Sequence, residues 1–542
     1  GLTSGLMRIL DFRTAPPGFS LRPILIVSAA IPRPACGPTP ALGGRKPSPM
    51  RVLEVASEAV PFAKTGGLAD VAGALPGALA RLGCDVTLVL PAYRQVFEQG
   101  LPIEPTGIEF EVPIGTRRPN ARVLRCPLPN SSVTALLIAN DEFFDRPTLY
   151  GGAHDYPDNA ERFIFFSRAA VELACRQAAP FDIIHCHDWQ TGLVPAYQKI
   201  LYRSWPAVAQ TRTVMTLHNM AYQGLFWHWD MLLTGLDWKY FNWQQMEFHE
   251  QLNLLKTGIV FADAVSTVSP TYAREIQTPA GGCGLEGLLT SRSNVLTGIV
   301  NGIDTTAWNP AADPYIPRPY GPDDVEEGKY AARVALAARL GHAAPDGRPL
   351  VAFVGRLVEQ KGVALVVEMI GRLAGTGRAH FMVLGTGDPA AEEAVRRAAA
   401  SFPGTVDALI GFDEGLAHLV QAAADIVLVP SRFEPCGLTQ LYAQRYGGLP
   451  VVRATGGLVD TVVDATPEAI REERATGFVF GPAEPEPFVQ AVERALDAHA
   501  DRDRWWPLVR HVMRQDWSWE ASGREYLRLF EQTLARAPAA GG

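Results

Sequence analysis

The stretch VLEVASEAVPFAKTGGLADVAGALPGALARLGCDVTLVLP, residues 52–91, decides the fold class. It begins with an apolar run, Val52–Ser57, that predicts a buried strand, and it passes through a glycine turn into the helical pattern of Gly67–Leu82. A second apolar run, Asp85–Pro91, predicts the next strand. A strand, a helix and a strand in this order favour a parallel sheet covered by helices.

The same alternation continues along the first half of the chain. Later segments predict strands at Asp182–His187, Thr213–His218, Ala264–Val268 and Val295–Val300, a helix at Asp158–Ala179 and a β-rich insert at Ile108–Ala139.

A second series of strands and helices begins near Leu350. It predicts strands at Leu350–Gly355, His380–Gly385, Val406–Gly411, Asp425–Pro430 and Leu449–Arg453, with helices at Gly362–Ala374, Pro389–Ala400, Glu414–Ala424 and Leu438–Tyr446. The chain therefore predicts two doubly wound α/β domains that face each other across a cleft. In such sheets ligands bind beyond the carboxyl ends of the strands.

The expected domain limits follow from this pattern. Residues 50–304 are assigned to the first domain and residues 346–515 to the second. The intervening residues, 305–345, contain a cluster of prolines that is typical of an interdomain connection. Residues 516–542 are expected to hold one last aromatic-rich helix, about Trp519–Arg536, and a frayed tail.

The first 49 residues differ from the rest of the sequence. They are rich in Pro, Arg and Gly, and Asp11 is their only acid. We expect a disordered extension outside the fold. A targeting peptide is the alternative, because the apolar run Ile24–Ile31 follows three arginines.

Composition excludes several classes of protein. The 542 residues carry a formal net charge of −8, which argues against non-specific nucleic-acid binding. No apolar run is long enough to span a membrane. The seven cysteines form no Cys-x-x-Cys pair, so we expect a reduced cytoplasmic protein without a disulfide framework or a structural zinc.

Two turns with the pattern Gly-Gly-Leu-x-Asp suit phosphate binding. The first contains Lys64, Gly66 and Gly67 and precedes a helix, whose free N–H groups favour an anion. The second, at Gly456 and Gly457, also stands between a strand and a helix. The structural alternative is a pair of ordinary glycine turns, the first with a solvated lysine.

Two cations follow the first strand of the second series. Arg356 and Lys361 are five residues apart and could neutralise a diphosphate leaving group together. Two exposed cations on a loop are the alternative.

Polar residues also follow neighbouring strands of the first domain. His187-Asp188-Trp189 and His218-Asn219 stand at such positions, and we favour ligand contact for Asp188 and His218, with Trp189 in the core. No cluster of His, Cys and Asp has the spacing of a metal site, so the sequence predicts no required metal.

Glu434 follows the predicted strand Asp425–Pro430. Its carboxylate could face the positive charge that develops at a sugar carbon, because a glycosyl transition state is oxocarbenium-like. An ion pair with the nearby Arg432 is the structural alternative.

Taken together, these motifs resemble those of the bacterial glycogen synthases. The similar segments are Lys64–Val71, His218–Gly224, Val268–Glu275, Asn301–Asp304, Arg432–Gln440 and Arg453–Leu458. They are collinear from Met50 to about Tyr526, so the resemblance covers nearly the whole chain.

The resemblance implies a retaining glucosyltransferase of GT-B architecture. Such enzymes transfer glucose from ADP-glucose, as co-substrate, to the non-reducing end of an α-1,4-glucan such as glycogen and release ADP, without a cofactor. It also implies that the last helix crosses back onto the first domain.

The resemblance implies roles for single residues as well. Lys64 would contact the phosphates of the nucleotide sugar, and Arg356 and Lys361 would stabilise the departing diphosphate. The amides of Thr455, Gly456 and Gly457 would bind the distal phosphate. His218 would contact the transferred glucose, Asp188 and Asn301 would line the sugar site, and Glu434 would lie near the reacting sugar.

Two positions depart from the wider pattern. Many retaining relatives have a second Glu eight residues after the first, and Tyr442 stands there, as in the glycogen and starch synthase branch. Phe412 replaces a frequent Tyr and retains a ring that can stack on adenine.

Three alternatives stay open. They are a related transferase that uses UDP-glucose, a catalytically silent glucan-binding homologue, and an NAD-dependent dehydrogenase. The last lacks a Gly-x-Gly-x-x-Gly turn in its first strand–helix unit.

Overall fold

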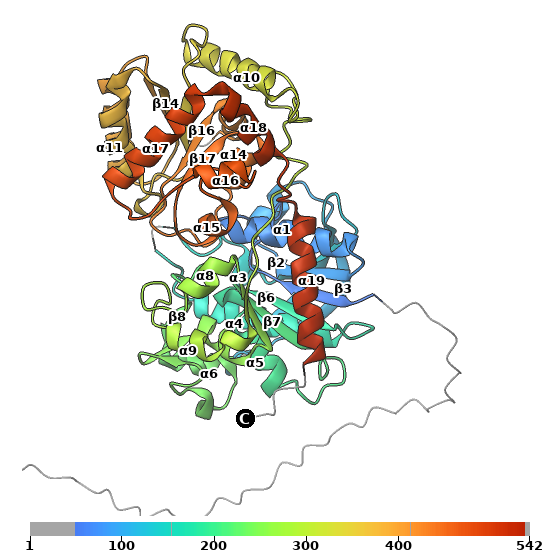
Figure 1. The fold of residues 1–542 in the computed structure, drawn as a ribbon. Helices are drawn as coiled ribbons and strands as arrows, with labels where there is room; N and C mark the ends of the chain where they lie inside the picture. The colour runs from blue at the N-terminus through green and yellow to red at the C-terminus, as the bar shows by residue number, and fades with distance from the viewer. Residues whose placement is uncertain (1–48, 153, 412, 537–542) are drawn as a thin grey trace, which may run out of the picture. The chain divides into compact units, whose positions relative to one another are not determined.

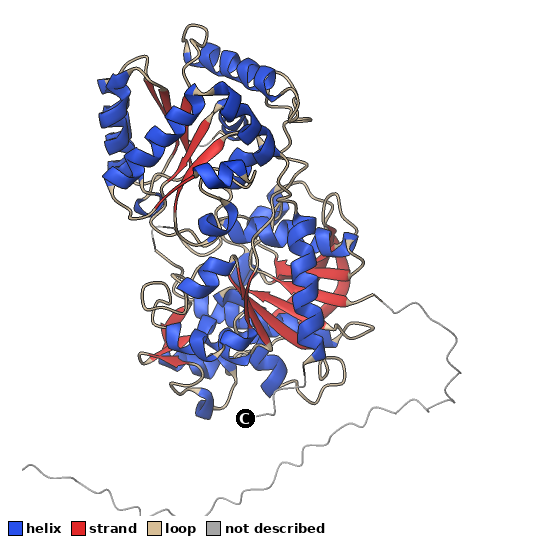
Figure 2. Ribbon diagram, viewed as in Figure 1, coloured by secondary structure: helices blue, strands red, loops and turns tan. Residues whose placement is uncertain are grey.

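The computed structural model describes residues 49–152, 154–411 and 413–536. The expectations for residues 1–48, for Phe412 and for the tail from Ala537 lie outside the described residues. Figure 1 traces the chain and Figure 2 its secondary structure.

The first domain is built on a nine-stranded sheet in the order β12-β11-β7-β6-β1-β2-β5-β4-β3. Its strands are β1 Arg51–Val55, β2 Asp85–Pro91, β3 Glu104–Glu111, β4 Asn120–Pro127, β5 Thr134–Ala139, β6 Ile183–His187, β7 Arg212–Leu217, β11 Ala264–Thr267 and β12 Leu296–Gly298. All pairs from β12 to β5 are parallel, whereas β4 pairs antiparallel with both β5 and β3. The β-rich insert is thus the antiparallel edge of a mixed sheet.

The helices of the first domain are α1 Gly67–Arg81, α2 Arg94–Glu98, α3 Asp141–Phe144, α4 Asn159–Cys175, α5 Leu193–Ile200, α6 Met231–Thr234, α7 Leu254–Phe261, α8 Pro270–Glu275 and α9 Glu286–Ser291. A small antiparallel sheet, which the sequence analysis does not foresee, joins β8 Leu225–Trp227, β10 Gln251–Asn253 and β9 Glu247–Phe248.

The second domain is built on a parallel six-stranded sheet in the order β15-β14-β13-β16-β17-β18. Its strands are β13 Leu350–Val354, β14 His380–Gly385, β15 Val406–Ile410, β16 Ile426–Val429, β17 Leu449–Arg453 and β18 Phe478–Phe480. Its helices are α10 Val325–Leu340, α11 Val363–Leu373, α12 Pro389–Ser401, α13 Glu414–Ala423, α14 Thr439–Arg445, α15 Gly457–Thr461, α16 Pro467–Arg471, α17 Pro485–Ala500 and α18 Arg502–Met513.

Each sheet has its own hydrophobic core, which accounts for the predicted α/β fold of two Rossmann-like domains. Helix α10 lies in the stretch expected to be a connection, and its Val325 and Leu336 belong to the second core. The ammonium of Lys329 on the same helix donates to the carbonyls of Ala422 and Ala424. The proline-rich connection is therefore shorter than expected, because a helix begins after its last proline.

The last helix, α19 Trp519–Ala535, packs against α1 of the first domain, as Figure 1 shows. Gly523 permits this close approach, since a Cβ there would lie 3.1 Å from the Leu82 side chain. The hydroxyl of Ser522 donates to the carbonyl of Val300 at 2.7 Å.

None of the helices in the described part of the chain is long and apolar enough to cross a membrane. The cytoplasmic location stays a prediction.

Candidate active site

The residues singled out in the sequence follow the central strands of both sheets. In the first sheet β1 lies between β2 and β6, and in the second β13 lies between β14 and β16, so the order of the strands reverses beside β1 and β13. Lys64 follows β1, Asp188 follows β6, Arg356 follows β13 and Glu434 follows β16. Such switch points are where ligands bind in open parallel sheets.

Glu434 and Lys361 form the central ion pair of the second domain. The Lys361 ammonium lies 2.5 Å from Glu434 Oε2, and the Ser431 hydroxyl donates to the same oxygen at 2.9 Å. The carboxylate of Glu434 is almost fully buried, whereas the lysine side chain is 22% exposed. Arg432 instead approaches Glu359 at 3.6 Å, so the expected structural alternative, a pair between Arg432 and Glu434, is not formed.

Arg356 stands beside this pair on the same loop. Its only hydrogen bond within the described residues is a long one, 3.5 Å, to Gln360 Oε1. The side-chain amide of Gln360 in turn donates to the carbonyl of Phe433 at 3.2 Å, and its backbone carbonyl accepts from the amide of Arg432, which joins the loops after β13 and β16. Arg356 is exposed and offers its guanidinium to an anion.

The first Gly-Gly-Leu-x-Asp turn is open to solvent. Residues 64–67 are all exposed, and a Cβ on Gly66 or Gly67 would meet no atom within 4 Å. The Lys64 ammonium pairs with Asp70 at 2.7 Å, with 53% of its side chain exposed. The amides of Thr65 and Gly66 donate to the buried carboxylate of Glu58 at 2.5 and 3.3 Å. Neither glycine has a positive φ, so the turn geometry does not require them.

The second turn is closed and buried. Gly456 has φ of +46°, and a Cβ there would lie 1.9 Å from the carbonyl oxygen of Glu434. The Gly457 amide donates to that carbonyl at 3.1 Å, and the Gly456 amide donates to Glu275 Oε1 at 2.9 Å. The amide of Thr455 donates to the carbonyl of Arg453. All three amides expected to bind the distal phosphate are thus used within the protein in this conformation, and their contact with a phosphate stays a prediction.

Asp188 stands in an unusual backbone conformation, with φ of +55°. Such a conformation costs about 1–3 kcal/mol and is common at functional sites. Its Oδ1 accepts from the amide of His218 at 2.7 Å. Burial raises the pKa of Asp188 to about 7, although the amide hydrogen bonds from His218 and Asn219 oppose this shift.

His218 lies next to Asp188 at the end of β7. Its Nε2 is 3.0 Å from Nδ1 of His187, the last residue of β6. Burial lowers the pKa of His218 well below its ordinary value, and the neighbouring imidazoles of His187 and His185 lower it further. His218 is therefore a neutral imidazole at neutral pH.

Asn301 and Tyr442 have different surroundings. Asn301 is buried, and its Oδ1 has no hydrogen-bond partner among the described residues. Tyr442 stacks on Trp308 with ring centroids 3.9 Å apart, and His418 also stacks on Trp308, with ring centroids 3.8 Å apart. The tyrosine at the position of the second Glu therefore packs against the connection between the domains.

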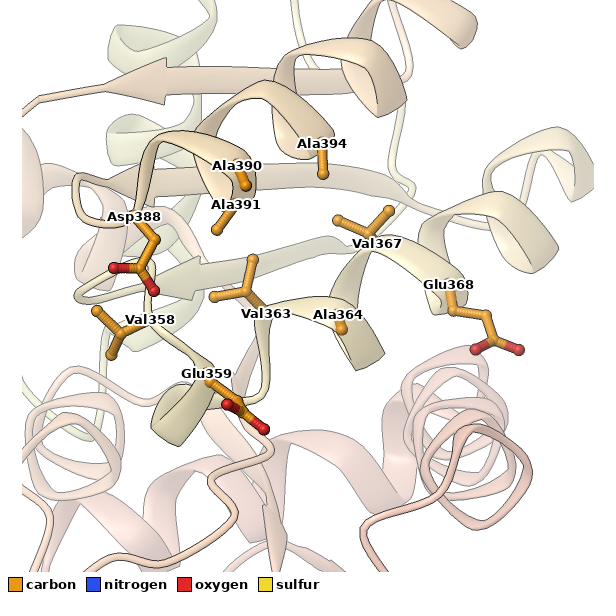
Figure 3. A pocket seen from close by; sticks show the side chains of 10 residues that line it. All are labelled: Val358, Glu359, Val363, Ala364, Val367, Glu368, Asp388, Ala390, Ala391 and Ala394. Carbon is orange, nitrogen blue, oxygen red and sulfur yellow. The ribbon is translucent and has the colours of Figure 1, made fainter.

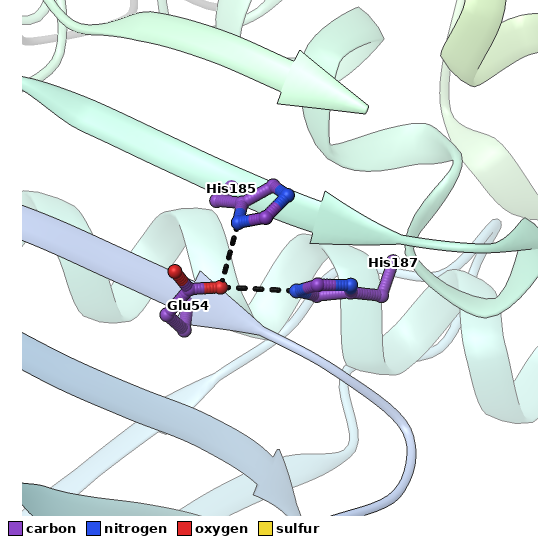
Figure 4. Close-up of side chains that lie close together, drawn as sticks. All are labelled: Glu54, His185 and His187. Carbon is purple, nitrogen blue, oxygen red and sulfur yellow. Dashed lines mark hydrogen bonds and ion pairs between the residues drawn. The ribbon is translucent and has the colours of Figure 1, made fainter. Parts of the chain in front are cut away.

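The structure also reveals a buried group that the sequence analysis missed. Figure 4 shows Glu54 of β1 between His185 and His187 of β6, with Glu54 Oε2 at 2.8 Å from His185 Nδ1 and 2.9 Å from His187 Nε2. Two imidazoles and a carboxylate are also donors that zinc prefers. The signal was a glutamate in the middle of an apolar strand, which requires a buried partner.

The pocket in Figure 3 lies between α11 and α12. Apolar side chains and the carboxylates of Glu359, Glu368 and Asp388 line it, without a cation. This charge does not suit a diphosphate, and no residue that the sequence singled out lies there.

Comparisons with known proteins agree with the motifs. A family model described as the starch synthase catalytic domain matches residues 51–291, and one described as glycosyl transferases group 1 matches residues 337–507. The glycogen synthase of Anaeromyxobacter sp. (strain Fw109-5) is 47% identical over 487 residues, which cover 90% of this chain and 100% of that protein. The chain belongs to the glycogen synthase family. The resemblance drawn from the motifs is thereby confirmed.

Another member of the glycogen synthase family is similar to nearly the whole chain as well. The glycogen synthase of Rhodopirellula baltica is 42% identical over 501 residues, which cover 90% of this chain and 98% of that protein. Membership in this family excludes the dehydrogenase alternative.

Solved structures confirm the GT-B fold. The catalytic domain of Starch Synthase IV from Arabidopsis thaliana, bound to ADP and acarbose, is 35% identical and aligns with a TM-score of 0.82, over 90% of this chain and 100% of that one. A sucrose-phosphate synthase from Thermosynechococcus elongatus aligns with a TM-score of 0.55 at 18% identity and supports the fold alone.

Proposed function

We propose that this glycogen synthase transfers glucose from ADP-glucose to the non-reducing end of an α-1,4-glucan with retention of configuration and releases ADP. The observation that carries this proposal is the buried pair of Lys361 and Glu434 beside the exposed Arg356, at the switch point of the second sheet. The binding of ADP and acarbose by the similar starch synthase supports both substrate classes.

The two cations serve the leaving group in this proposal. Negative charge grows on the diphosphate as the glycosidic bond breaks, so a charge that acts mainly then lowers the barrier. Arg356 supplies a planar fork of donors and Lys361 a point charge. Lys64, on the exposed first turn with Gly66 and Gly67, binds the phosphates in the ground state.

The amides of residues 455–457 are used within the protein in this conformation, and the start of α14 offers further donors. Helix α14 begins at Thr439, four residues after Pro435, and the amides of Leu438 and Thr439 have no acceptor among the described residues. These two amides stand beside those of residues 455–457 as candidate donors to the distal phosphate.

The sugar lies between the remaining residues. Glu434 stabilises the positive charge at the reacting carbon, and His218, Asp188 and Asn301 contact the hydroxyls. The acceptor 4-OH attacks on the face that the diphosphate leaves, and a phosphate oxygen takes its proton. This route needs no covalent enzyme intermediate.

The test is ADP release in the presence of glycogen, with ADP-glucose and UDP-glucose compared at equal concentration. Efficient release of ADP that depends on glycogen is expected, with little UDP from the other donor. Preference for UDP-glucose would favour the related transferase, and no release from either donor would favour a silent glucan-binding homologue.

A further inference from the structure

A buried chain of side chains runs from the first strand of the first sheet to the proposed sugar site. Glu54 and His185 are paired in the register of β1 and β6, and His187 is two residues further along the same face. The side chains of Glu54, His185 and His187 are fully buried (Figure 4). His187 therefore has a carboxylate on one side of its ring.

Both ring nitrogens of His187 have partners. Nε2 lies 2.9 Å from Glu54 Oε2, and Nδ1 lies 3.0 Å from His218 Nε2. Glu54 is thus connected to His218 through one imidazole and two hydrogen bonds.

The charge of Glu54 decides the direction of these bonds. Burial alone would raise the pKa of Glu54, but the charges and hydrogen bonds of His185 and His187 outweigh burial and lower it to about 2. An ionised carboxylate only accepts, so Nε2 of His187 must carry a proton.

Burial, together with the nearby His185, lowers the pKa of His187 to about 4, so at neutral pH its Nδ1 holds a lone pair. That lone pair accepts the proton on Nε2 of His218. The second nitrogen of His218, Nδ1, is then left without a proton.

We propose that Glu54, acting through His187, fixes the tautomer of His218, so that His218 offers an unprotonated Nδ1 to a hydroxyl of the transferred sugar. Glu54 is then a positioning residue, and the inference rests on the proposed contact between His218 and the sugar. A neutral acceptor at this place adds no positive charge beside the oxocarbenium-like centre.

Apolar packing alone does not explain a glutamate at position 54. Its Oε1 is buried without a hydrogen-bond partner in the described part of the chain. Because its contacts with the two histidines lower its pKa, the ionised carboxylate stabilises the folded state, and its removal is expected to cost stability. A residue needed only for packing would be apolar here.

A metal ion is the competing explanation for the same three residues. Oε2 of Glu54 lies at hydrogen-bond distance from both imidazoles. In the proposed chain of hydrogen bonds Nε2 of His187 keeps its proton, whereas a ring nitrogen that binds a metal gives its proton up. The two explanations therefore predict different protonation of His187.

The experiment is a long-range ¹H–¹⁵N correlation spectrum of the full chain labelled with ¹⁵N-histidine. The spectrum of His218→Asn identifies the His218 signals among the eleven histidines of the sequence. We expect the Nε2–H tautomer in the wild type and a loss of that preference in Glu54→Gln. An Nδ1–H tautomer in the wild type, or an unchanged tautomer in Glu54→Gln, would overturn the inference.

Kinetic measurements and the metal content of the protein give independent readouts. At a temperature where both proteins are folded, Glu54→Gln is expected to lower kcat by about 10- to 100-fold, the scale seen when the hydrogen-bond partner behind a functional histidine is lost. Asp425→Asn, which changes a buried carboxylate of the second domain, is the matched control and should lower stability without altering the His218 tautomer. Metal bound in stoichiometric amount to the wild type and absent from Glu54→Gln would overturn the inference.

The proposed function is tested separately by His218→Asn. If that variant keeps the full kcat of the wild type, the proposed contact between His218 and the sugar is wrong. If it loses kcat while Glu54→Gln does not, only the role of Glu54 fails.

Discussion

The two Gly-Gly-Leu-x-Asp turns share a sequence pattern and differ in almost every contact. The first, at Gly66 and Gly67, is exposed and has open space around both glycines. The second, at Gly456 and Gly457, is buried, and its backbone lies directly on the carbonyl of Glu434. The first is suited to meet a ligand, whereas the second positions a residue of the site.

The aspartates that end the two turns differ in the same way. Asp70 pairs with the exposed Lys64 of its own turn. Asp460 accepts from the amide and the hydroxyl of Thr271, on helix α8 of the first domain, at 2.7 and 2.8 Å. A repeated motif thus indicates a repeated local shape, and its function depends on what packs against it.

The largest effect is expected for Gly456→Ala. The new Cβ would overlap the Glu434 carbonyl at a positive φ, so we expect a loss of about 3 kcal/mol or more of stability, from overpacking and backbone strain together. Gly66→Ala is the matched control, with a change within about 1 kcal/mol. Urea unfolding of both variants measures these changes in stability, and equal unfolding midpoints would contradict the difference between the two turns.

Next in size is Glu434→Gln. Loss of the charge beside the reacting sugar should lower kcat by about 10²-fold, the scale of a lost electrostatic contact in a transition state. Glu58→Gln changes the carboxylate of the first turn and should act mainly on the KM for ADP-glucose. Full kcat in Glu434→Gln would reject a charge role for that carboxylate.

A smaller effect concerns the dependence of stability on pH. Burial raises the pKa of Asp188 to about 7, above the ordinary 3.8. The folded state then holds a proton that the unfolded state has lost, so stability falls as pH rises from about 4 to 7. Relative to Asp188→Asn, the wild type should lose about 2 kcal/mol between pH 5 and 7. Parallel curves of Tm against pH for the two proteins would contradict this.

The smallest effects are expected for the two aspartates. Asp460→Asn removes the charge from two hydrogen bonds between the domains and should cost about 1 kcal/mol. Asp70→Asn alters an exposed pair and should stay within about 0.5 kcal/mol. Thermal unfolding of both variants distinguishes them, and a larger cost for Asp70→Asn would reverse the comparison.

Much of the fold was predictable because its strands are continuous apolar runs. The predicted strand at Asp85–Pro91 and the helix near Gly67–Leu82 agree with β2 and α1 within one residue. Helix α10 was missed because the prolines before it dominated the pattern. The antiparallel pairing of β3 and β4 depends on contacts far along the chain, which periodicity does not record.

The site was predictable in its residue types and less so in its contacts. The sequence singled out Glu434 and Lys361 separately, and only the fold brings them within 2.5 Å. Glu54 went unnoticed because its partner His187 lies on a strand 133 residues away in sequence. The occupation of the Gly456 amide by Glu275 likewise follows from packing between the domains.

The most direct test of this account is the pair of kcat and KM for ADP-glucose in Lys361→Ala and Lys64→Ala, measured by ADP release with glycogen. Lys361 belongs to the buried pair with Glu434, and Lys64 stands on the exposed turn. We predict that Lys361→Ala lowers kcat by about 10²-fold, whereas Lys64→Ala mainly raises KM. A kcat within twofold of the wild type in Lys361→Ala would contradict the account.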